Sequence, residues 1–346
     1  MPGNYLNFPF DNELFMMMWQ QAQDPVKTAL LTSGAMVESA EIRGLIANGS
    51  NLYTIPFYDV LGGDEQNYDG KTDITETEHS GKYQTGVVYG RAKSWMARDF
   101  VYDFNSGANP MASIVSQISQ YWAKKRQARM IGILDGIFSV DDDSTPEWDD
   151  WQLHTLNIAT SSDSATEANK VDEASAADAM QQAAGDNSGI FSMAIMHSKV
   201  AANLAKLNLL QYRKYTDPSG IERQLNLADW NGLTVIIDDG VPVATNSSAS
   251  SEKDYTTYLF GRGALLTAPA PVMHPVENGR EAKKYGGYDY IINRFRETIH
   301  PNGFSFVADV STNVSPTDET LKAKASWKLC GMNPKVLPMA RIISNG

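Results

Sequence analysis

The chain has 346 residues, of which 42% are hydrophobic and 20% are charged, as in ordinary globular proteins. At roughly 150 residues per domain, this length indicates about two domains or one large elaborated domain. The composition argues against wholesale disorder and against a collagen-like or coiled-coil rod. The single cysteine, Cys330, excludes an intrachain disulfide and a multi-cysteine zinc site and favours a reducing compartment.

The charge is unevenly distributed along the chain. There are 29 basic and 41 acidic residues, a net charge of -12. Between residues 139 and 190, twelve acids accompany a single base, Lys170, so the rest of the chain is nearly neutral. Proteins that read a DNA sequence are normally basic, so this function is disfavoured. The sequence has no apolar run of about 18 residues and no early basic region, so we expect a protein assembled in the cytoplasm, without a membrane partner.

The first 50 residues are expected to form an arm. They contain too little apolar material to fold alone, and Asp24-Pro25 ends the one helix that their pattern predicts, over residues 12–23. The arm is expected to pack either on its own domain or on a neighbouring subunit. The apolar face of the helix consists of Leu14, Phe15, Met18 and Trp19.

Two aromatic-rich segments, 53–58 and 83–89, are expected to be strands. Between them lies a polar stretch, residues 62–82, which we call the polar loop. Loops of this length usually have a function or are disordered. We therefore predict a hairpin whose loop is ordered by a neighbouring chain, with a flexible surface loop as the alternative. The polar loop has two bases, Lys71 and Lys82, and six acids, Asp64, Glu65, Asp69, Asp73, Glu76 and Glu78.

A long helix is predicted over residues 109–138. It starts at Pro110, after the capping candidate Asn109, and apolar residues then recur with a period of 3.6 over nearly thirty residues. Its length would be roughly 40 Å at about 1.5 Å per residue. A basic cluster in the middle is expected to be either a solvated helix face or a patch facing phosphate. The basic cluster consists of Lys124, Lys125, Arg126 and Arg129.

Downstream, the pattern alternates between strands and helices. The expected elements are strands at 151–156, 190–196, 233–237 and 256–260, helices at 171–184 and 198–207, a strand pair over 288–307, and a final strand at 336–343. Residues 171–290 are therefore expected to form a compact mixed α/β unit.

No motif specifies chemistry. The five histidines are scattered, and Asp141-Asp142-Asp143 lacks the glycine and terminal glutamate of a calcium loop. Gly261-Arg262-Gly263 lacks the third glycine of a dinucleotide fingerprint, and Cys330 has no base nearby in the sequence. The sequence predicts no catalytic residue, no cofactor and no metal site, so we expect a protein that is not an enzyme.

The order of arm, polar hairpin, long helix, mixed unit and returning strand resembles the major capsid proteins of tailed double-stranded DNA bacteriophages. The phrases at 190–207 and at 232–242 are similar to that family's strand-then-helix element and to its axial-domain strand and turn. The resemblance implies an α+β fold with a long spine helix, a β-sheet peripheral domain and a mixed α/β axial domain. The implied divisions are an arm at 1–50, an extended loop at 51–100, a peripheral domain at 101–170 and 291–346, and an axial domain at 171–290.

The function implied by the resemblance is self-assembly into pentamers and hexamers of an icosahedral virion capsid that encloses double-stranded DNA. A separate scaffolding protein, a portal and a decoration protein are implied as further partners. Two alternatives remain at this point: an encapsulin-like nanocompartment shell, and a metal-dependent enzyme using the acidic segment 139–190. The residues expected at intersubunit contacts are Phe15, Met18, Trp19, Asp64, Glu65, Asp73, Glu76 and Glu78, and those expected to face DNA are Lys124, Lys125, Arg126 and Arg129.

Overall fold

The structure of the chain is a computed structural model. It describes residues 3–5, 8–10, 34–47, 49–58, 65–71, 73, 76, 81–99, 110–140, 147–160, 165–216, 222–245, 253–311 and 314–346. The helices are α3 (Ala40–Ile46), α5 (Pro110–Phe138), α6 (Glu147–Gln152), α7 (Ser175–Ala184), α8 (Ser198–Lys206) and α9 (Asp318–Lys322). Short 3-10 turns cover Glu167–Asn169, Gly185–Ile190, Lys324–Ser326 and Pro334–Val336.

The strands of the described residues fall into two large sheets and three two-stranded pairs. The first nine are β1 (Gly3–Tyr5), β2 (Phe8–Phe10), β3 (Met36–Glu38), β4 (Leu52–Tyr58), β5 (Gly81–Val87), β6 (Tyr89–Arg98), β7 (Thr155–Asn157), β8 (Phe191–Met196) and β9 (Gln211–Thr216). The others are β10 (Glu222–Trp230), β11 (Leu233–Ile237), β12 (Val243–Thr245), β13 (Lys253–Gly261), β14 (Leu265–Ala270), β15 (Val276–Glu281), β16 (Tyr288–Pro301), β17 (Phe304–Phe306), β18 (Trp327–Leu329) and β19 (Met339–Ser344).

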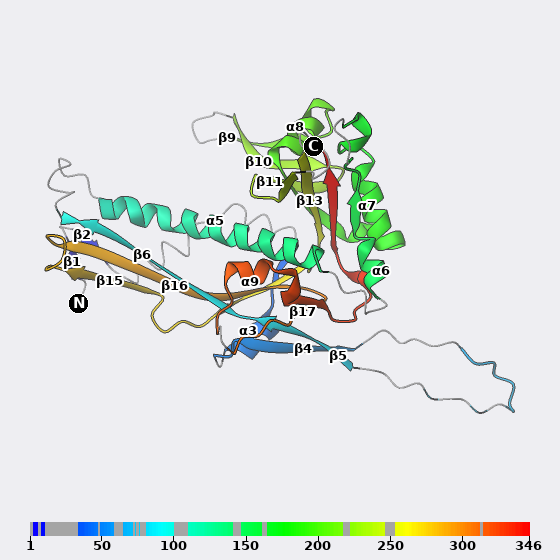
Figure 1. The fold of residues 1–346 in the computed structure, drawn as a ribbon, viewed down its shortest axis with the longest axis horizontal. Coiled ribbons are helices and arrows are strands. Elements are labelled where there is room, and N and C mark those ends of the chain that lie inside the picture. The colour runs from blue at the N-terminus through cyan, green and yellow to red at the C-terminus, as the bar shows by residue number, and fades with distance from the viewer. Residues whose placement is uncertain are drawn as a thin grey trace.

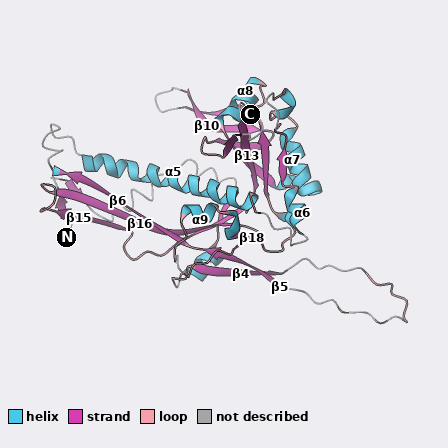
Figure 2. Ribbon diagram, viewed as in Figure 1, coloured by secondary structure: helices cyan, strands magenta, loops and turns pink. Residues whose placement is uncertain are grey.

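The molecule is elongated (Figure 1). The helix α5 lies along a long narrow sheet of β15, β16 and β6, and the eight-stranded sheet stands at the C-terminal end of α5 with α7 and α8. The β4–β5 hairpin projects from the long sheet in the direction opposite to the turn between β15 and β16 (Figures 1 and 2). The two ends of the molecule are therefore the polar loop and the β15–β16 turn.

The eight-stranded sheet has helices on both faces. Its order is β7-β19-β13-β8-β11-β10-β9, with β12 paired to β13. Along β8, Met193 and Ile195 join the core that contains the C-terminal half of α5, whereas Ala194 and Met196 join the core under α7 and α8. This alternation is the two-residue period of a strand that is buried on both faces.

The long sheet is organised around β16, a strand of 14 residues. β16 pairs in antiparallel register with β15 and β14 along one edge and with β6 along the other, and β3 pairs with β14. The register sets Tyr89 opposite Glu297 and Arg98 opposite Tyr288. Since β6 continues directly from β5, the hairpin and the long sheet form one extended arrangement.

Most of the predicted elements are confirmed, including the hairpin strands, the long helix, and the strands and helices between residues 175 and 261. The predicted strand at 151–156 is wrong over its first residues. These belong to α6, whose Trp148 and Trp151 lie three residues apart and are both buried. A strand pair within 288–307 is wrong as well, because β17 pairs with β18 rather than with β16. The helix expected over residues 12–23 lies outside the described residues.

The sheets divide the chain differently from the expected domain boundaries. β19 pairs with β13 in the eight-stranded sheet, although residues 291–346 were expected to be peripheral. β14 and β15 pair with β16 in the long sheet, although they fall within the segment expected to be axial. The sheet to which each of these strands belongs is determined by pairing between residues far apart in the sequence. Local sequence patterns do not encode such pairing.

Candidate functional site

The hairpin stem, formed by β4 and β5, has one buried and one exposed face. Its register runs from Leu52 opposite Val87 to Tyr58 opposite Gly81. Tyr53 and Ile55 are buried, whereas Tyr58 and Tyr83 expose most of their side chains. The stem is thus fixed to the body on one side and presents aromatic rings on the other.

A chain of hydrogen bonds anchors the buried face to β16. The Thr298 hydroxyl donates to the carbonyl of Val87 at 2.8 Å, so the Tyr53 hydroxyl donates to Thr298 Oγ1, also at 2.8 Å. Burial raises the pKa of Tyr53, which keeps its phenol protonated. The ring lies directly over Gly86, where a Cβ would come within 2.2 Å of the Tyr53 Cζ. The stem therefore requires glycine at position 86.

Gln84 makes a second anchor, and it is itself buried. Its Oε1 accepts from the backbone N–H of Gly303 at 3.0 Å and from Nε2 of His300 at 3.2 Å, and its Nε2 donates to Asn302 Oδ1 at 3.3 Å. Full burial lowers the pKa of His300 to about 4, so its imidazole is neutral at pH 7. The Gln84 side chain thus makes three hydrogen bonds inside the protein, whereas Nδ1 of the buried His300 has no hydrogen-bond partner among the described residues.

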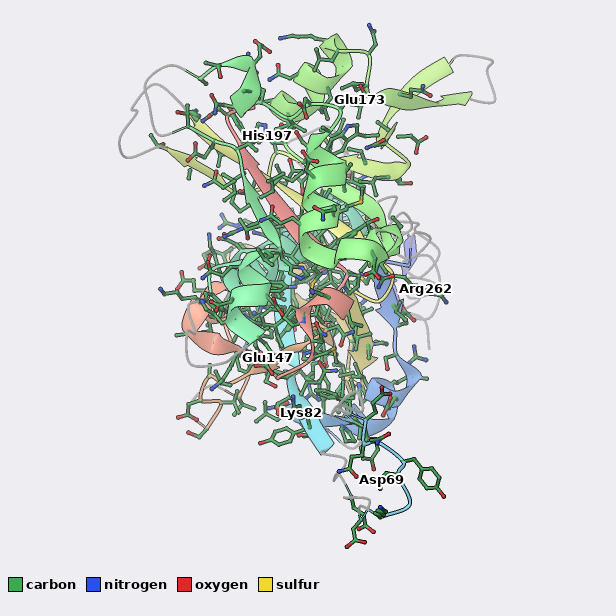
Figure 3. All side chains as sticks on the ribbon, turned by 90° about the vertical axis from the view of Figure 1, so that its right-hand side faces the viewer. Asp69, Lys82, Glu147, Glu173, His197 and Arg262 are labelled. Atoms are coloured by element: carbon green, nitrogen blue, oxygen red, sulfur yellow. The ribbon has the colours of Figure 1, made fainter. Side chains whose placement is uncertain are left out.

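Lys82, at the end of the polar loop, also bonds within its own chain. Its ammonium donates to the carbonyl of Gly331 at 2.5 Å and lies 3.8 Å from a Glu147 carboxylate oxygen. Figure 3 shows Lys82 and Glu147 on the body, with Asp69 beyond them at the end of the projecting loop. These contacts join the hairpin to the body at its root.

Apart from the half-buried Lys82, the described residues of the polar loop are exposed. They include three of the expected intersubunit residues, Glu65, Asp73 and Glu76, and one further loop acid, Asp69. A local bond from the N–H of Lys71 to Asp69 Oδ1, at 2.8 Å, closes a turn there. The other expected intersubunit residues lie outside the described residues; they are Phe15, Met18, Trp19, Asp64 and Glu78.

The basic cluster of α5 divides into two pairs. Lys124 and Lys125 are exposed. Arg126 and Arg129 instead point into the protein, and the side chain of Arg129 is only 2% exposed. Of the four residues expected to face DNA, only the two lysines therefore lie on the surface of the subunit.

The two arginines enter a buried ion-pair network centred on Glu297. Arg126 Nε donates to one carboxylate oxygen of Glu297 at 2.9 Å, and the Tyr89 hydroxyl donates to the other at 2.9 Å. Arg129 lies with its guanidinium carbon 4.7 Å from the centre of the Tyr89 ring and donates through Nε to Asp318 at 2.8 Å. The network ties α5 to β16, β6 and α9.

Asp318 extends this network to the surface. Partial burial alone would raise the pKa of its carboxyl, but hydrogen bonds from Arg129 and Arg91 hold it below its usual value. Arg91 also donates to the carbonyl of Pro316 at 2.7 Å. Sequence reasoning missed Glu297 and Asp318; a glutamate in the middle of a central strand was the available signal, since such a charge requires partners.

The described part of the chain contains no helix that is both long and apolar enough to cross a membrane. It also contains no group of three or more histidine, cysteine, aspartate or glutamate side chains arranged to hold a metal ion.

Comparison with known proteins identifies the family. No family model matches the chain. The major capsid protein of Bacillus phage SPP1 is 29% identical over 303 residues, which cover 87% of this chain and 86% of that protein. Among solved structures, the capsid of Ralstonia phage GP4 has a TM-score of 0.58 at 11% identity and covers 90% of this chain and 87% of that one.

The cyanophage Pam1 capsid has a TM-score of 0.50 at 13% identity and covers 86% of this chain and 85% of that one. The structural matches establish the fold, with its long helix and sheets, and the relation to the SPP1 protein decides between the alternatives left open by the sequence. The chain is a major capsid protein of the tailed-phage family, a structural, non-enzymatic component of the icosahedral virion shell.

Proposed function

We propose that the chain builds the pentamers and hexamers of its capsid by laying the polar loop of each subunit across a neighbour. The observation that carries this proposal is the contrast within one hairpin. Its stem is fixed by buried hydrogen bonds from Tyr53 and Gln84, whereas the described loop acids are exposed. A rigid base under a solvent-facing loop suits contact with another chain.

The energetics support the same assignment. Ordering each loop residue costs about 1–2 kcal/mol of backbone entropy. Leu61 and Ile74 are almost the only aliphatic residues in or beside the polar loop, so the loop cannot offset this cost by burying its own side chains. A neighbouring subunit would supply the missing contacts at every interface of a closed lattice.

We also propose that Lys124 and Lys125 face the packaged double-stranded DNA. Contact with phosphate independent of sequence needs only a few cations, and it weakens as salt rises. Replacing both lysines with glutamine should leave shells intact and change genome packing. The arginines of the basic cluster are unsuitable for this test, because they hold the interior network together. Lysines found on the outer surface of the shell would refute the assignment.

The N-terminal arm is proposed to act between subunits. Phe15, Met18 and Trp19 would each contribute about 1.5–3 kcal/mol when fully buried. Replacing all three with serine should weaken the shell more than it destabilises the isolated subunit. Equal losses of shell stability and of subunit stability would show that the arm packs on the core of its own subunit. A separate scaffolding protein, a portal and a decoration protein remain proposed partners by the same family relation.

The decisive test of the proposed function is a subunit with a short loop. Replacing residues 59–80 with Asn-Gly retains both stem strands and closes them with a two-residue turn. We expect soluble subunits with an unchanged melting temperature that fail to close shells under negative-stain microscopy. Normal particles from this variant would refute the loop's role in assembly.

A further inference from the structure

The end of the molecule opposite the polar loop carries an exposed basic and aromatic surface. It is the turn between β15 and β16 together with the end of β6, and we call it the tip surface: Arg98, Lys283, Lys284 and Tyr285. All four residues are exposed. The Arg98 guanidinium carbon lies 4.6 Å from the centre of the Tyr285 ring, a cation–π arrangement.

The backbone of this turn makes the tyrosine unusual. The N–H of Gly287 donates to the carbonyl of Lys284 at 2.9 Å, and the two residues between them, Tyr285 and Gly286, have φ of 53° and 77°. Turns with positive φ at both central positions favour asparagine, aspartate or glycine, and a bulky residue there is strained. The turn therefore holds a large ring in solvent, 65% exposed, at a position where its backbone favours a smaller residue.

The charge of the tip surface is available to a partner. Arg280, just beside it, is neutralised by Asp99 and Asp289. Neither Lys283 nor Lys284 forms an ion pair with any described residue. Glu281 is the acid nearest in sequence to the two lysines, and it is partly buried. Exposed tyrosine and arginine together are typical of the residues that dominate protein interfaces.

The polar loop of the same chain cannot reach this surface. β5 and β6 have 7 and 10 residues and follow one another, so at about 3.3 Å per residue they span roughly 55 Å between the loop and the tip surface. The loop also projects away from the tip (Figure 1). Any contact between these two ends must therefore join different copies of the chain.

We propose that the tip surface receives the acidic polar loop of a neighbouring subunit. This inference rests on the proposed function of the loop and adds the surface to which it binds. Six acids against two lysines in the loop complement the cations of the tip surface, and the exposed Tyr285 ring offers apolar area beside them. The contact is heterologous, so it propagates around a ring or lattice, and its charges fix the register between subunits.

Zero-length crosslinking tests the contact directly. Carbodiimide joins a carboxylate to a lysine in contact with it, so treated shells digested for mass spectrometry should contain peptides linking Glu65 or Asp69 to Lys283 or Lys284. Crosslinks from the loop to the lysines of residues 322–335 instead would overturn the proposal and leave the loop's role in assembly intact.

Charge reversal provides the matched test. Lys283→Glu with Lys284→Glu should raise the subunit concentration needed for shell formation about tenfold, because like charges then face each other. Adding Glu65→Lys and Asp69→Lys in the same chain should restore assembly. The control, Lys199→Glu with Lys335→Glu, makes the same charge change at exposed lysines elsewhere and should assemble normally.

The Tyr285→Asn variant tests the contribution of the exposed ring to assembly separately from the stability of the subunit. Asparagine suits the turn, so the melting temperature of the subunit should stay the same or rise, while assembly weakens. Normal assembly of both the reversed and the asparagine variants would overturn the proposal. If the short-loop variant fails to assemble in the same experiments, the function of the loop stands and only its receiving surface is wrong.

Discussion

Glu297 places a single carboxylate between an arginine of α5 and a tyrosine of β6, with a second arginine 3.8 Å away. Its side chain is 13% exposed, so water supplies little of its solvation. Burial, and then the neighbouring carboxylate, raise the pKa of Tyr89, which therefore remains a donor. A buried charge network of this kind is retained only when each member has a partner.

Replacing Glu297 with glutamine should be strongly destabilising. The substitution removes the charge that compensates Arg126 and Arg129, and breaking a buried pair typically costs about 3–5 kcal/mol. The free energy of unfolding of the unassembled subunit in urea measures this effect. Glu277→Gln, which breaks an exposed pair with Arg294, serves as the control and should change little. A small effect at both positions would contradict the account of the network.

His300 should make the hairpin root sensitive to acid. Its pKa is about 4 in the folded chain against an ordinary value of 6.5, so between these values the unfolded state binds more protons. Stability from this group is fully present above pH 6.5 and is lost as the pH falls towards 4, by about 3 kcal/mol in total.

The measurement is the free energy of unfolding between pH 4 and 7, compared between wild type and His300→Gln. Subtracting the two curves removes the titration of the carboxylates, which both proteins share. The difference should grow smaller as the pH falls through this window. Parallel curves would show that His300 does not titrate in this way.

At the scale of elements, α5 is fixed by the close approach of α9. A Cβ on Gly136 would lie 2.8 Å from the carbonyl oxygen of Lys322, whereas a Cβ on Gly132 would lie 3.9 Å from the nearest atom, the Lys322 Cβ. The two glycines share one helix and the same intrinsic helix propensity. Their surroundings alone should separate the effects of substituting them.

Gly132→Ala should stabilise the subunit by about 0.5–1 kcal/mol, the gain expected from replacing a helical glycine. Gly136→Ala should destabilise it despite the same gain, because the backbone of α9 would have to move. Thermal unfolding of the two variants provides the comparison. Equal stabilisation by both substitutions would show that α9 does not pack as closely as described.

Sequence patterns predict those elements whose signals are local in the chain. The period of α5 and the aromatic strands of the hairpin were readable because their signals are local. The pairing of β19 with β13 was not, since it joins residues far apart in the chain. Arg126 and Arg129 were read as surface charges for the same reason: their partners come from β16 and α9, and no local pattern contains them.

At the scale of the whole molecule, the polar loop and the tip surface lie at opposite ends of an elongated subunit. Complementary ends suit a protein that must repeat one contact many times in a closed shell. The stem is held by interior hydrogen bonds, so the place where the loop leaves the body is fixed before any neighbour arrives. In this account, assembly orders the loop rather than the stem.

Hydrogen exchange in unassembled subunits and in finished shells tests this claim most directly. The account predicts that the stem strands β4 and β5 are protected in both states. Residues 62–82 should exchange fast in free subunits and become strongly protected in shells. Equally fast exchange across 62–82 in both states would contradict the account, because the loop would then make no ordered contact with a neighbour.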